Sequence, residues 1–358
     1  MEAILPKTLY RESLHSPIGA MLTPIFGMHY FLTLASRDKR DKVDPKDFTI
    51  EDLNGETAGR APGSINGQQF IIRNCQDSNI YILDHMATIT IDDCVNCRIF
   101  LGPTKSSVFI RDCKDCKFAL ACQQLRTRDC HRIDFFLFCS TFPSIESSVG
   151  FKLECFQCYY PELEDQFKAA GLGIYDNNWS RVHDFSIVPG ESNYGFLPLN
   201  SNLAEYIPLP DVEKFNVAMN GSKEFSVVPY TLGSRPKPSD ESCLVVFFND
   251  GLSQERAHKF IAEMNKTGEF VIVQSKEVSM QPQDVVRVFN NDSYAMVAEQ
   301  GPVIGFEFNG NGVCAACQDS LMAINKGSTG AVFASSSPAA AAQQIESFYN
   351  FVDIKMAV

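Results

Sequence analysis

The feature that most constrains this chain is a fourfold repeat between residues 75 and 137. Each copy opens with Asn-Cys or Asp-Cys and carries apolar residues five and seven positions after the cysteine. The opening cysteines lie 19, 19 and 17 residues apart and are Cys75, Cys94, Cys113 and Cys130. A period of about twenty residues is typical of a solenoid, in which each coil is covered only by its neighbours. Because alternating apolar residues indicate strands, the repeat predicts a parallel β-helix with equivalent residues stacked on one another.

A zinc site is the competing interpretation of these cysteines. Four of them follow the spacing of a zinc ribbon, namely Cys94, Cys97, Cys113 and Cys116. The first column, however, continues to Cys75 and Cys130. The second column continues to Ser78 and Ile133, neither of which is a thiol ligand. Two parallel ladders do not converge on one metal ion, so the pattern favours buried thiols, with zinc as the alternative that a metal assay would test.

Composition limits the class of protein. The 358 residues are 45% apolar and 21% charged, which is ordinary for a globular chain of two or three domains. The net charge of −12 argues against a nucleic-acid binder, which would carry a basic stripe. The 13 cysteines, most of them at solenoid positions, predict reduced thiols in a cytoplasmic protein.

Four segments are expected along the chain. Residues 1–46 form a divergent leader that we expect to be disordered. Residues 47–188 form the parallel β-helix, together with a helix over residues 161–171 that would cap its open end. Residues 189–240 form a Pro-rich linker, and residues 241–358 form a C-terminal α/β domain.

The leader has no charged side chain between residues 16 and 36. Prolines, glycines, threonines and a histidine interrupt this run, whereas a membrane helix needs about twenty strongly apolar residues. Glu2 and Glu12 fall where a signal peptide would be basic. We therefore expect a disordered or loosely attached segment, with a membrane segment as the alternative.

Strands alternate with helices beyond residue 240. Strands are expected over residues 243–248, 270–279, 301–308 and 331–334, and helices over residues 253–266, 282–290, 313–325 and 339–351. This alternation is typical of an α/β domain built in layers.

One stretch breaks the rhythm of the solenoid. Residues 121–128 shorten the period from 19 to 17 and carry two glutamines and two arginines that packing does not require. An arginine on a stiff scaffold suits the neutralisation of a transferring phosphoryl group, because its planar fork matches phosphate oxygens. Arg126, with Gln123 and Gln124 beside it, is therefore the candidate site. The alternative is a solvated polar turn, since surface arginines are common.

Two further positions belong to this hypothesis. Glu146 is a carboxylate that could hold the Arg126 guanidinium in one rotamer, although an exposed pair contributes little and a solvated carboxylate is the alternative. Ser107 lies as far after its repeat cysteine as Arg126 lies after the next one, so the two are expected close together on adjacent coils. Ordinary turn residues are the alternative for Ser106 and Ser107.

From about residue 42 to the C-terminus, several motifs together resemble the tubulin cofactor C family. They are Lys-Val-Asp-Pro-Lys-Asp at 42–47, Thr-Ile-Asp-Asp-Cys at 90–94, Phe-Leu-Gly-Pro at 100–103, Ala-Cys-Gln-Gln at 121–124, Arg-Asp-Cys at 128–130, Cys-Phe-Gln at 155–157, Tyr-Tyr-Pro-Glu-Leu at 159–163, Asp-Glu-Ser-Cys-Leu-Val-Val at 240–246 and Ser-Phe-Tyr-Asn-Phe at 347–351. The resemblance implies a right-handed parallel β-helix followed by an α/β domain similar to nucleoside diphosphate kinase, with a ferredoxin-like fold.

The resemblance also implies an activity, which is GTPase activation of an Arf-like small GTPase in the trafficking of lipidated cargo to the cilium. Arg126 matches the family's arginine finger, Gln124 acts beside it, and Glu146 matches the glutamate that supports the finger. The positions implied to contact GTP are Ser106, Ser107, Gln123, Gln124, Leu125 and Arg126. Ser106 stands where the family usually has glycine. The chain would hold no cofactor or metal of its own, because the partner GTPase would bind GTP and Mg²⁺.

Departures from the resemblance define the alternatives. A member of the family begins Met-Gly-Cys and is doubly acylated at the cytoplasmic face of the plasma membrane, whereas this chain begins Met-Glu-Ala. We therefore expect a cytoplasmic and ciliary protein without that anchor. No histidine lies near the third strand of the C-terminal domain, which argues against kinase chemistry. The alternatives are a non-catalytic GTPase effector or scaffold, and GTPase activation directed at tubulin together with tubulin cofactors.

Overall fold

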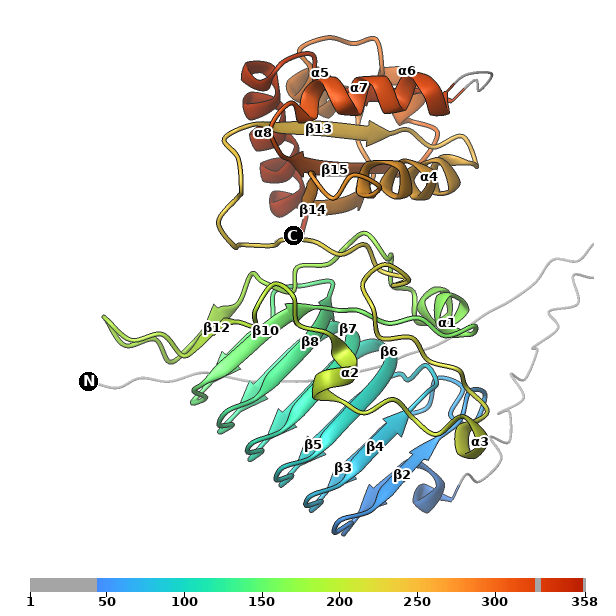
Figure 1. The fold of residues 1–358 in the computed structure, drawn as a ribbon, viewed down its shortest axis with the longest axis vertical. Coiled ribbons are helices and arrows are strands. Elements are labelled where there is room, and N and C mark those ends of the chain that lie inside the picture. The colour runs from blue at the N-terminus through green and yellow to red at the C-terminus, as the bar shows by residue number, and fades with distance from the viewer. Residues whose placement is uncertain (1–43, 326–329, 357–358) are drawn as a thin grey trace, which may run out of the picture. The chain divides into compact units, whose positions relative to one another are not determined.

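Residues 49–155 form the coils of a parallel β-helix in a computed structural model that describes residues 44–325 and 330–356 (Figure 1). Residues 1–43 of the predicted leader lie outside the described residues. The solenoid and the segments around it comprise η1 (Pro45–Phe48), β1 (Thr49–Glu51), β2 (Thr57–Arg60), β3 (Phe70–Arg73), β4 (Asn79–Ile82), β5 (Ile89–Asp92), β6 (Arg98–Arg111), β7 (Lys117–Arg128), β8 (Asp134–Cys139), β9 (Ser144–Glu146), β10 (Phe151–Cys155), α1 (Leu163–Ala170), β11 (His183–Asp184), β12 (Tyr194–Phe196), α2 (Leu203–Tyr206) and α3 (Val212–Phe215). The predicted β-solenoid is therefore confirmed.

Two strips of parallel strands run along the solenoid. The first strip pairs β2, β4, β6, β7, β8, β10 and β12 in that order. The second strip pairs β1, β3, β5, β6, β7, β9 and β11 in the same way. Strands β6 and β7 belong to both strips, because each of them continues through the corner between the strips.

Asparagine and aspartate turn one corner of each coil. The residue before each repeat cysteine has a φ of 52° or 53°, and these residues are Asn74, Asp93, Asp112 and Asp129. Asn and Asp adopt this left-handed conformation more easily than other non-glycine residues, because their short side chains bond locally to the backbone. The cysteine that follows is buried in the solenoid core, which explains why the two residues recur as a pair.

The repeat cysteines stack from coil to coil, as the ladder interpretation predicts. The residues that follow them bridge in parallel between coils, and these are Gln76, Val95, Lys114 and His131. The Cys97 thiol donates to the Cys75 carbonyl at 3.3 Å, and the Cys116 thiol donates to the Cys94 carbonyl at 3.4 Å. All 13 cysteines are free and buried. Among the residues that the structure describes, no group of three or more His, Cys, Asp or Glu side chains is arranged to hold a metal ion.

Four strands of the first strip, namely β4, β6, β7 and β8, bury apolar side chains on both faces, so their outer face needs a cover. The outward residues Phe100 and Phe138 belong to a second buried cluster, which also contains residues of α1 and of the segment over 197–228. Phe167 of α1 meets Phe138 edge to face, with ring centroids 5.2 Å apart. The sequence predicted that α1 caps the end of the solenoid. Instead α1 lies against the outer face of these strands, because that face carries large apolar side chains that water would otherwise reach.

The segment predicted as a Pro-rich linker makes specific contacts with the solenoid. Phe215 of α3 packs on Tyr81 of β4, with ring centroids 5.6 Å apart. Near the end of the segment, Arg235 forms an ion pair with Glu154 of β10 at 2.7 Å, and both side chains are buried. The guanidinium also lies 5.0 Å from the centroid of the Trp179 ring. These contacts fix the path of the chain from the solenoid to the C-terminal domain.

The C-terminal domain is an antiparallel sheet with helices. Its elements are β13 (Ser242–Phe247), α4 (Ser253–Asn265), β14 (Val271–Val278), α5 (Pro282–Phe289), α6 (Ala295–Ala298), β15 (Val303–Asn309), α7 (Val313–Ile324), β16 (Val332–Ala334) and α8 (Pro338–Met356). The sheet order is β14-β15-β13-β16 and every neighbouring pair is antiparallel. This order, with helices after the first and third strands, is typical of a ferredoxin-like fold. The similarity to nucleoside diphosphate kinase stays a prediction.

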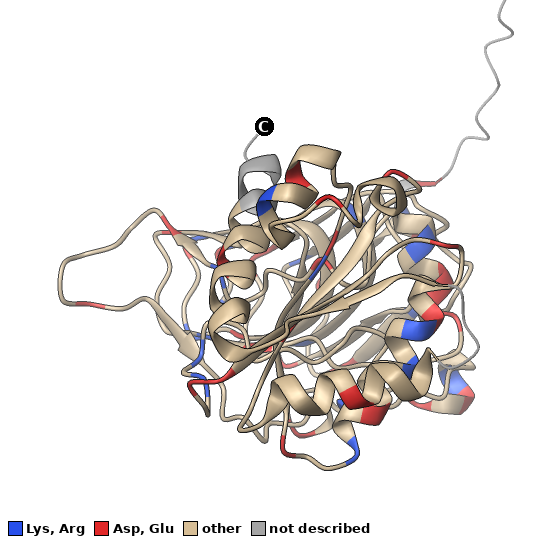
Figure 2. Cartoon of the chain, turned by 90° about the horizontal axis from the view of Figure 1, so that it is seen from above, with Lys and Arg blue, Asp and Glu red and all other residues tan. Residues whose placement is uncertain are grey.

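Seen from above, acidic and basic residues are scattered over the molecule (Figure 2). Among the helices of this domain, α4 carries both signs, whereas α6 carries no charged residue and α7 carries only Asp319. Helix α4 packs against α7, α8 packs against α5, and both α7 and α8 contact β13. In the described ranges, no helix is both long and apolar enough to cross a membrane.

Candidate functional site

Arg126 lies on β7 in the second strip, between two parallel neighbours. It pairs with Phe109 of β6 on one side and with Ser144 of β9 on the other. The adjacent side chains of Leu125 and Thr127 are buried, whereas the Arg126 side chain is exposed. Strand pairing on both sides holds the Arg126 backbone in place, so little backbone entropy is lost when the side chain is used. The geometry therefore presents an arginine outward from a rigid surface.

Gln124 precedes Arg126 on the same face and is held by Ser107. The two residues lie directly opposite one another, and Ser107 Oγ donates to Gln124 Oε1 at 3.0 Å. Because Oε1 is occupied, the Nε2 amide hydrogens of Gln124 remain available to donate to a ligand. Ser107 was expected close to Arg126. It lies opposite the residue two positions earlier, because the shortened period shifts β7 by two residues relative to β6.

Glu146 shares a pocket with Arg126 without lying opposite it. In the ladder between β7 and β9, Glu146 pairs with Arg128, one step further along the same face. The pocket has a volume of about 690 Å³ and is lined by Gln124, Arg126, Thr127, Ser144, Ile145, Glu146, Ser147, Phe185 and Ser186. The structure thus brings Gln124, Arg126 and Glu146 together. The predicted ion pair between Arg126 and Glu146 is not formed among the described residues.

The remaining predicted positions divide between surface and core. Ser106 and Gln123 are exposed. Ser106 lies in a bulge of β6, where the register with β7 shifts, and such bulges often re-aim side chains beside functional sites. Leu125 corrects an expectation, because its side chain is 1% exposed and lies in the solenoid core. Only the Leu125 backbone can therefore meet a ligand.

Sequence reasoning missed Phe185 and Ser186, which follow β11 and line the same pocket. Phe185 is 67% exposed, and Ser186 Oγ accepts from the Ser147 backbone N–H at 2.6 Å. The connection between β11 and β12 projects from the solenoid and also exposes Ile187 and Val188 (Figure 1). The run Phe-Ser-Ile-Val was an available signal, since a cluster of exposed large apolar side chains often marks an interaction site.

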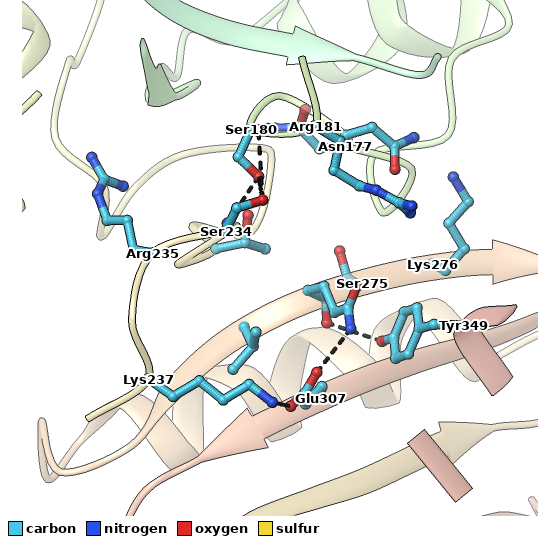
Figure 3. Close-up of a pocket in the computed structure, with 15 residues that line it drawn as sticks. Asn177, Ser180, Arg181, Ser234, Arg235, Lys237, Ser275, Lys276, Glu307 and Tyr349 are labelled. Carbon is cyan, nitrogen blue, oxygen red and sulfur yellow. Dashed lines mark hydrogen bonds and ion pairs between the residues drawn. The ribbon is translucent and has the colours of Figure 1, made fainter. Parts of the chain in front are cut away.

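A second pocket, of about 340 Å³, lies among residues 177–181, residues 231–237 and strands β14 and β15 (Figure 3). Three of its four basic side chains are paired with carboxylates of the chain, and the fourth, Arg181, lies over the Phe142 ring at 4.4 Å. The pairs are Lys237–Glu307, Arg235–Glu154 and Lys276–Asp176. Because three of these positive charges already have carboxylate partners from other segments, the pocket is explained as a junction that holds chain segments together.

Known proteins match most of this chain. The tubulin binding cofactor C family matches residues 67–185. Protein XRP2 of chicken, Gallus gallus, is 51% identical over 324 residues, which is 90% of each protein. Protein XRP2 of Homo sapiens is 49% identical over 326 residues and covers 90% of this chain and 92% of the human protein. Tubulin-specific chaperone C of Homo sapiens is 25% identical over 152 residues, which is 42% of this chain and 44% of that protein.

The alignment with human Protein XRP2 covers 90% of this chain and 92% of the human protein. It therefore extends over both the solenoid and the C-terminal domain. The family match over residues 67–185 contains the coils from β3 to β10 and every residue that lines the Arg126 pocket except Ser186. The chain therefore belongs to the XRP2 family and carries a tubulin binding cofactor C domain.

Proposed function

We propose that this chain is a GTPase-activating protein that supplies Arg126 in trans to an Arf-like small GTPase. The observation that carries the proposal is an exposed arginine on a doubly paired strand, beside a fixed glutamine and a pocket of about 690 Å³. The partner would bring GTP and Mg²⁺ into this pocket, and this chain would contribute side chains only.

The chemistry follows from how phosphoryl groups are transferred. Negative charge spreads over the transferring group in the transition state, and catalysis depends on positioning and on stabilising that charge. The Arg126 guanidinium would donate two hydrogen bonds to the γ-phosphate region. The Gln124 amide would donate a further hydrogen bond to the same γ-phosphate region. Glu146 would accept from the far side of the guanidinium once the side chain turns inward, since both residues line the pocket.

The experiment is single-turnover GTP hydrolysis by an Arf-like GTPase loaded with GTP and Mg²⁺, with and without this chain. We expect acceleration of about a thousandfold or more, the range reported for arginine fingers. Binding of the GTP-loaded partner with no acceleration would identify the chain as an effector or scaffold instead.

Tubulin is the second candidate partner. One relative of the family domain is named Tubulin-specific chaperone C, which motivates a parallel assay. Tubulin would be incubated with tubulin cofactors and with this chain, and GTP hydrolysis would be followed. Acceleration there, without acceleration of the Arf-like GTPase, would replace the first proposal.

The cellular part of the proposal is trafficking of lipidated cargo to the cilium, with the chain at cytoplasmic and ciliary sites. Its support is the family resemblance, and it depends on the activity above. Depletion of the chain would leave a lipidated ciliary reporter in the cell body, and an Arg126→Ala transgene would not restore it.

Ser107→Ala tests whether the fixed glutamine contributes. The substitution removes the donor to Gln124 Oε1, which lies 3.0 Å away, so the amide loses its orientation. We expect the saturating hydrolysis rate to fall about threefold to tenfold, as suits a hydrogen bond worth about 1 kcal/mol. Ser107→Thr keeps the hydroxyl and should stay near the wild-type rate. Equal losses in both variants would mean that packing, and not the hydrogen bond, is responsible.

Phe185→Ala tests the apolar rim of the pocket. The Phe185 ring is 67% exposed and is not expected to meet the transferring phosphoryl group. Its loss should therefore weaken partner binding and leave the saturating hydrolysis rate within about twofold of the wild-type rate. Titration of the GTPase at fixed nucleotide separates the two effects. Phe225→Ala is the matched control, since that ring is 63% exposed and does not line the pocket. A lower saturating rate with unchanged affinity would contradict this role.

A further inference from the structure

The contact that Arg126 makes in this structure is with an aromatic ring. Arg126 Cζ lies 6.0 Å from the centroid of the Phe109 ring. Phe109 is directly opposite Arg126 in the parallel ladder between β6 and β7, and its side chain is half-buried on the outer face. On the other side of Arg126 the ladder offers Ser144, which is small. The guanidinium therefore has a flat apolar neighbour on one side and open space on the other.

No other group of the described residues holds this side chain. Glu146 is one ladder step away, opposite Arg128, and the Arg128 guanidinium lies 3.3 Å from Asp129. Throughout the described parts of the chain, the Arg126 guanidinium forms no ion pair and no hydrogen bond. An exposed arginine without a partner samples many rotamers, and each must be given up when the side chain is used.

An aromatic face limits those rotamers without consuming the hydrogen bonds of the guanidinium. The ring attracts the cation within about 6 Å, and the attraction strengthens when water is excluded. The five N–H donors lie in the guanidinium plane, so a guanidinium stacked on a ring keeps its donors free for a phosphate. A carboxylate partner would occupy two of them.

We propose that Phe109 is a positioning residue for Arg126. It keeps the guanidinium extended over the second strip before the partner arrives, and it stays beneath the guanidinium when GTP is bound. This inference rests on the proposed GTPase activation. Phe109 acts through Arg126 and does not itself meet the reacting atoms.

Kinetics of Phe109→Leu, Phe109→Ala and Phe109→Tyr in the full chain test the role. Phe109→Leu and Phe109→Ala should lower the saturating single-turnover rate about five- to tenfold. The concentration of this chain that gives half of the saturating rate should stay within about twofold of the wild-type value. Phe109→Tyr keeps the ring and should restore the rate. Thr90→Ala is the matched control, because Thr90 is half-buried in the same column on the far side of Phe109. Wild-type rates in Phe109→Leu, or a loss seen only in half-saturation, would overturn the proposal.

A second measurement separates this inference from the proposed function. In ¹⁵N-arginine spectra of the free chain, the Arg126 Nε–H signal, assigned by its loss in Arg126→Lys, should shift in Phe109→Leu and stay in place in Thr90→Ala. If wild type accelerates hydrolysis, but Phe109→Leu changes neither the Arg126 signal nor the rate, the positioning role of Phe109 is rejected and the proposed function stands. If wild type does not accelerate hydrolysis, the proposed function fails, and the signal still decides whether the ring holds the guanidinium.

Discussion

Arg126→Ala should lower the accelerated rate of GTP hydrolysis about a thousandfold, to near the intrinsic rate of the GTPase. The lost guanidinium leaves the charge that develops on the transferring phosphoryl group uncompensated, and no other arginine in the described part of the chain lines the pocket. Because the side chain is exposed, the free energy of unfolding should change by less than about 0.5 kcal/mol. Single-turnover hydrolysis at saturating activator, with urea unfolding in parallel, measures both quantities.

Arg128→Ala is the matched control for this prediction. Arg128 lies two residues further along the same strand, is also exposed, and sits 3.3 Å from Asp129. Its removal subtracts the same charge from the same surface, so it should reduce the rate by less than about threefold if only steering is affected. Arg126→Lys keeps the charge without the planar fork and should recover little of the rate. Equal losses in Arg126→Ala and Arg128→Ala would indicate general electrostatics in place of a finger.

Arg235→Met should be the most destabilising of the substitutions considered, by about 3–5 kcal/mol. Arg235 and Glu154 form an ion pair at 2.7 Å, with 7% and 0% of their side chains exposed. Arg235 also donates to the Leu197 carbonyl at 2.8 Å and stacks near Trp179. Removing the arginine leaves the Glu154 carboxylate buried without its counter-charge. Urea unfolding followed by circular dichroism gives the change in the free energy of unfolding.

The double variant Glu154→Leu/Arg235→Met provides the control. It removes both charges, so it should recover a large part of the loss caused by Arg235→Met, since buried pairs are often replaceable by apolar groups. If the double variant is as unstable as Arg235→Met, the loss comes from the packing of Arg235 against Trp179 and not from the orphaned carboxylate.

The instability of Arg235→Met should also depend on pH. Burial raises the pKa of Glu154, while Arg235 lowers it. Without the arginine, the pKa in the folded state rises further above its unfolded value. A group with a raised folded pKa supports the fold below its unfolded pKa, about 4.3 for Glu, and that support is lost as the pH rises through the folded pKa. The gap between wild type and Arg235→Met should therefore narrow from pH 7.5 to pH 5, and a constant gap would contradict this reasoning.

Much of the fold could be predicted because its signals are local and repeated. The Asn/Asp-Cys pairs mark corners that need a left-handed residue followed by an inward one, and Asn74 and Asp93 adopt that conformation. The alternation of apolar and other residues after each repeat cysteine marks the strands. Helix α1 was placed wrongly because its own sequence says only that one face is apolar. Its position depends on Phe138 and other outward side chains of distant strands.

The candidate site was predicted in part for the same reason. The break in the repeat at residues 121–128 identified the stretch that contains Arg126 and Gln124. The sequence could not decide that Ser107 faces Gln124, or that Phe109 faces Arg126, because a difference of two residues between coil lengths sets that register. It also missed Phe185, which reaches the pocket from a later segment of the chain.

By itself, the sequence determined that this chain forms a β-solenoid with an α/β domain, because strand periodicity and corner residues are properties of neighbouring positions in the chain. The tertiary structure alone decided which side chains surround the Arg126 guanidinium. Those neighbours come from β6, β9 and the segment after β11, and only the stacking of coils brings them to one face. The register between two stacked coils depends on the lengths of both, so a difference of two residues between the coils of β6 and β7 places Phe109, and not Ser107, opposite Arg126.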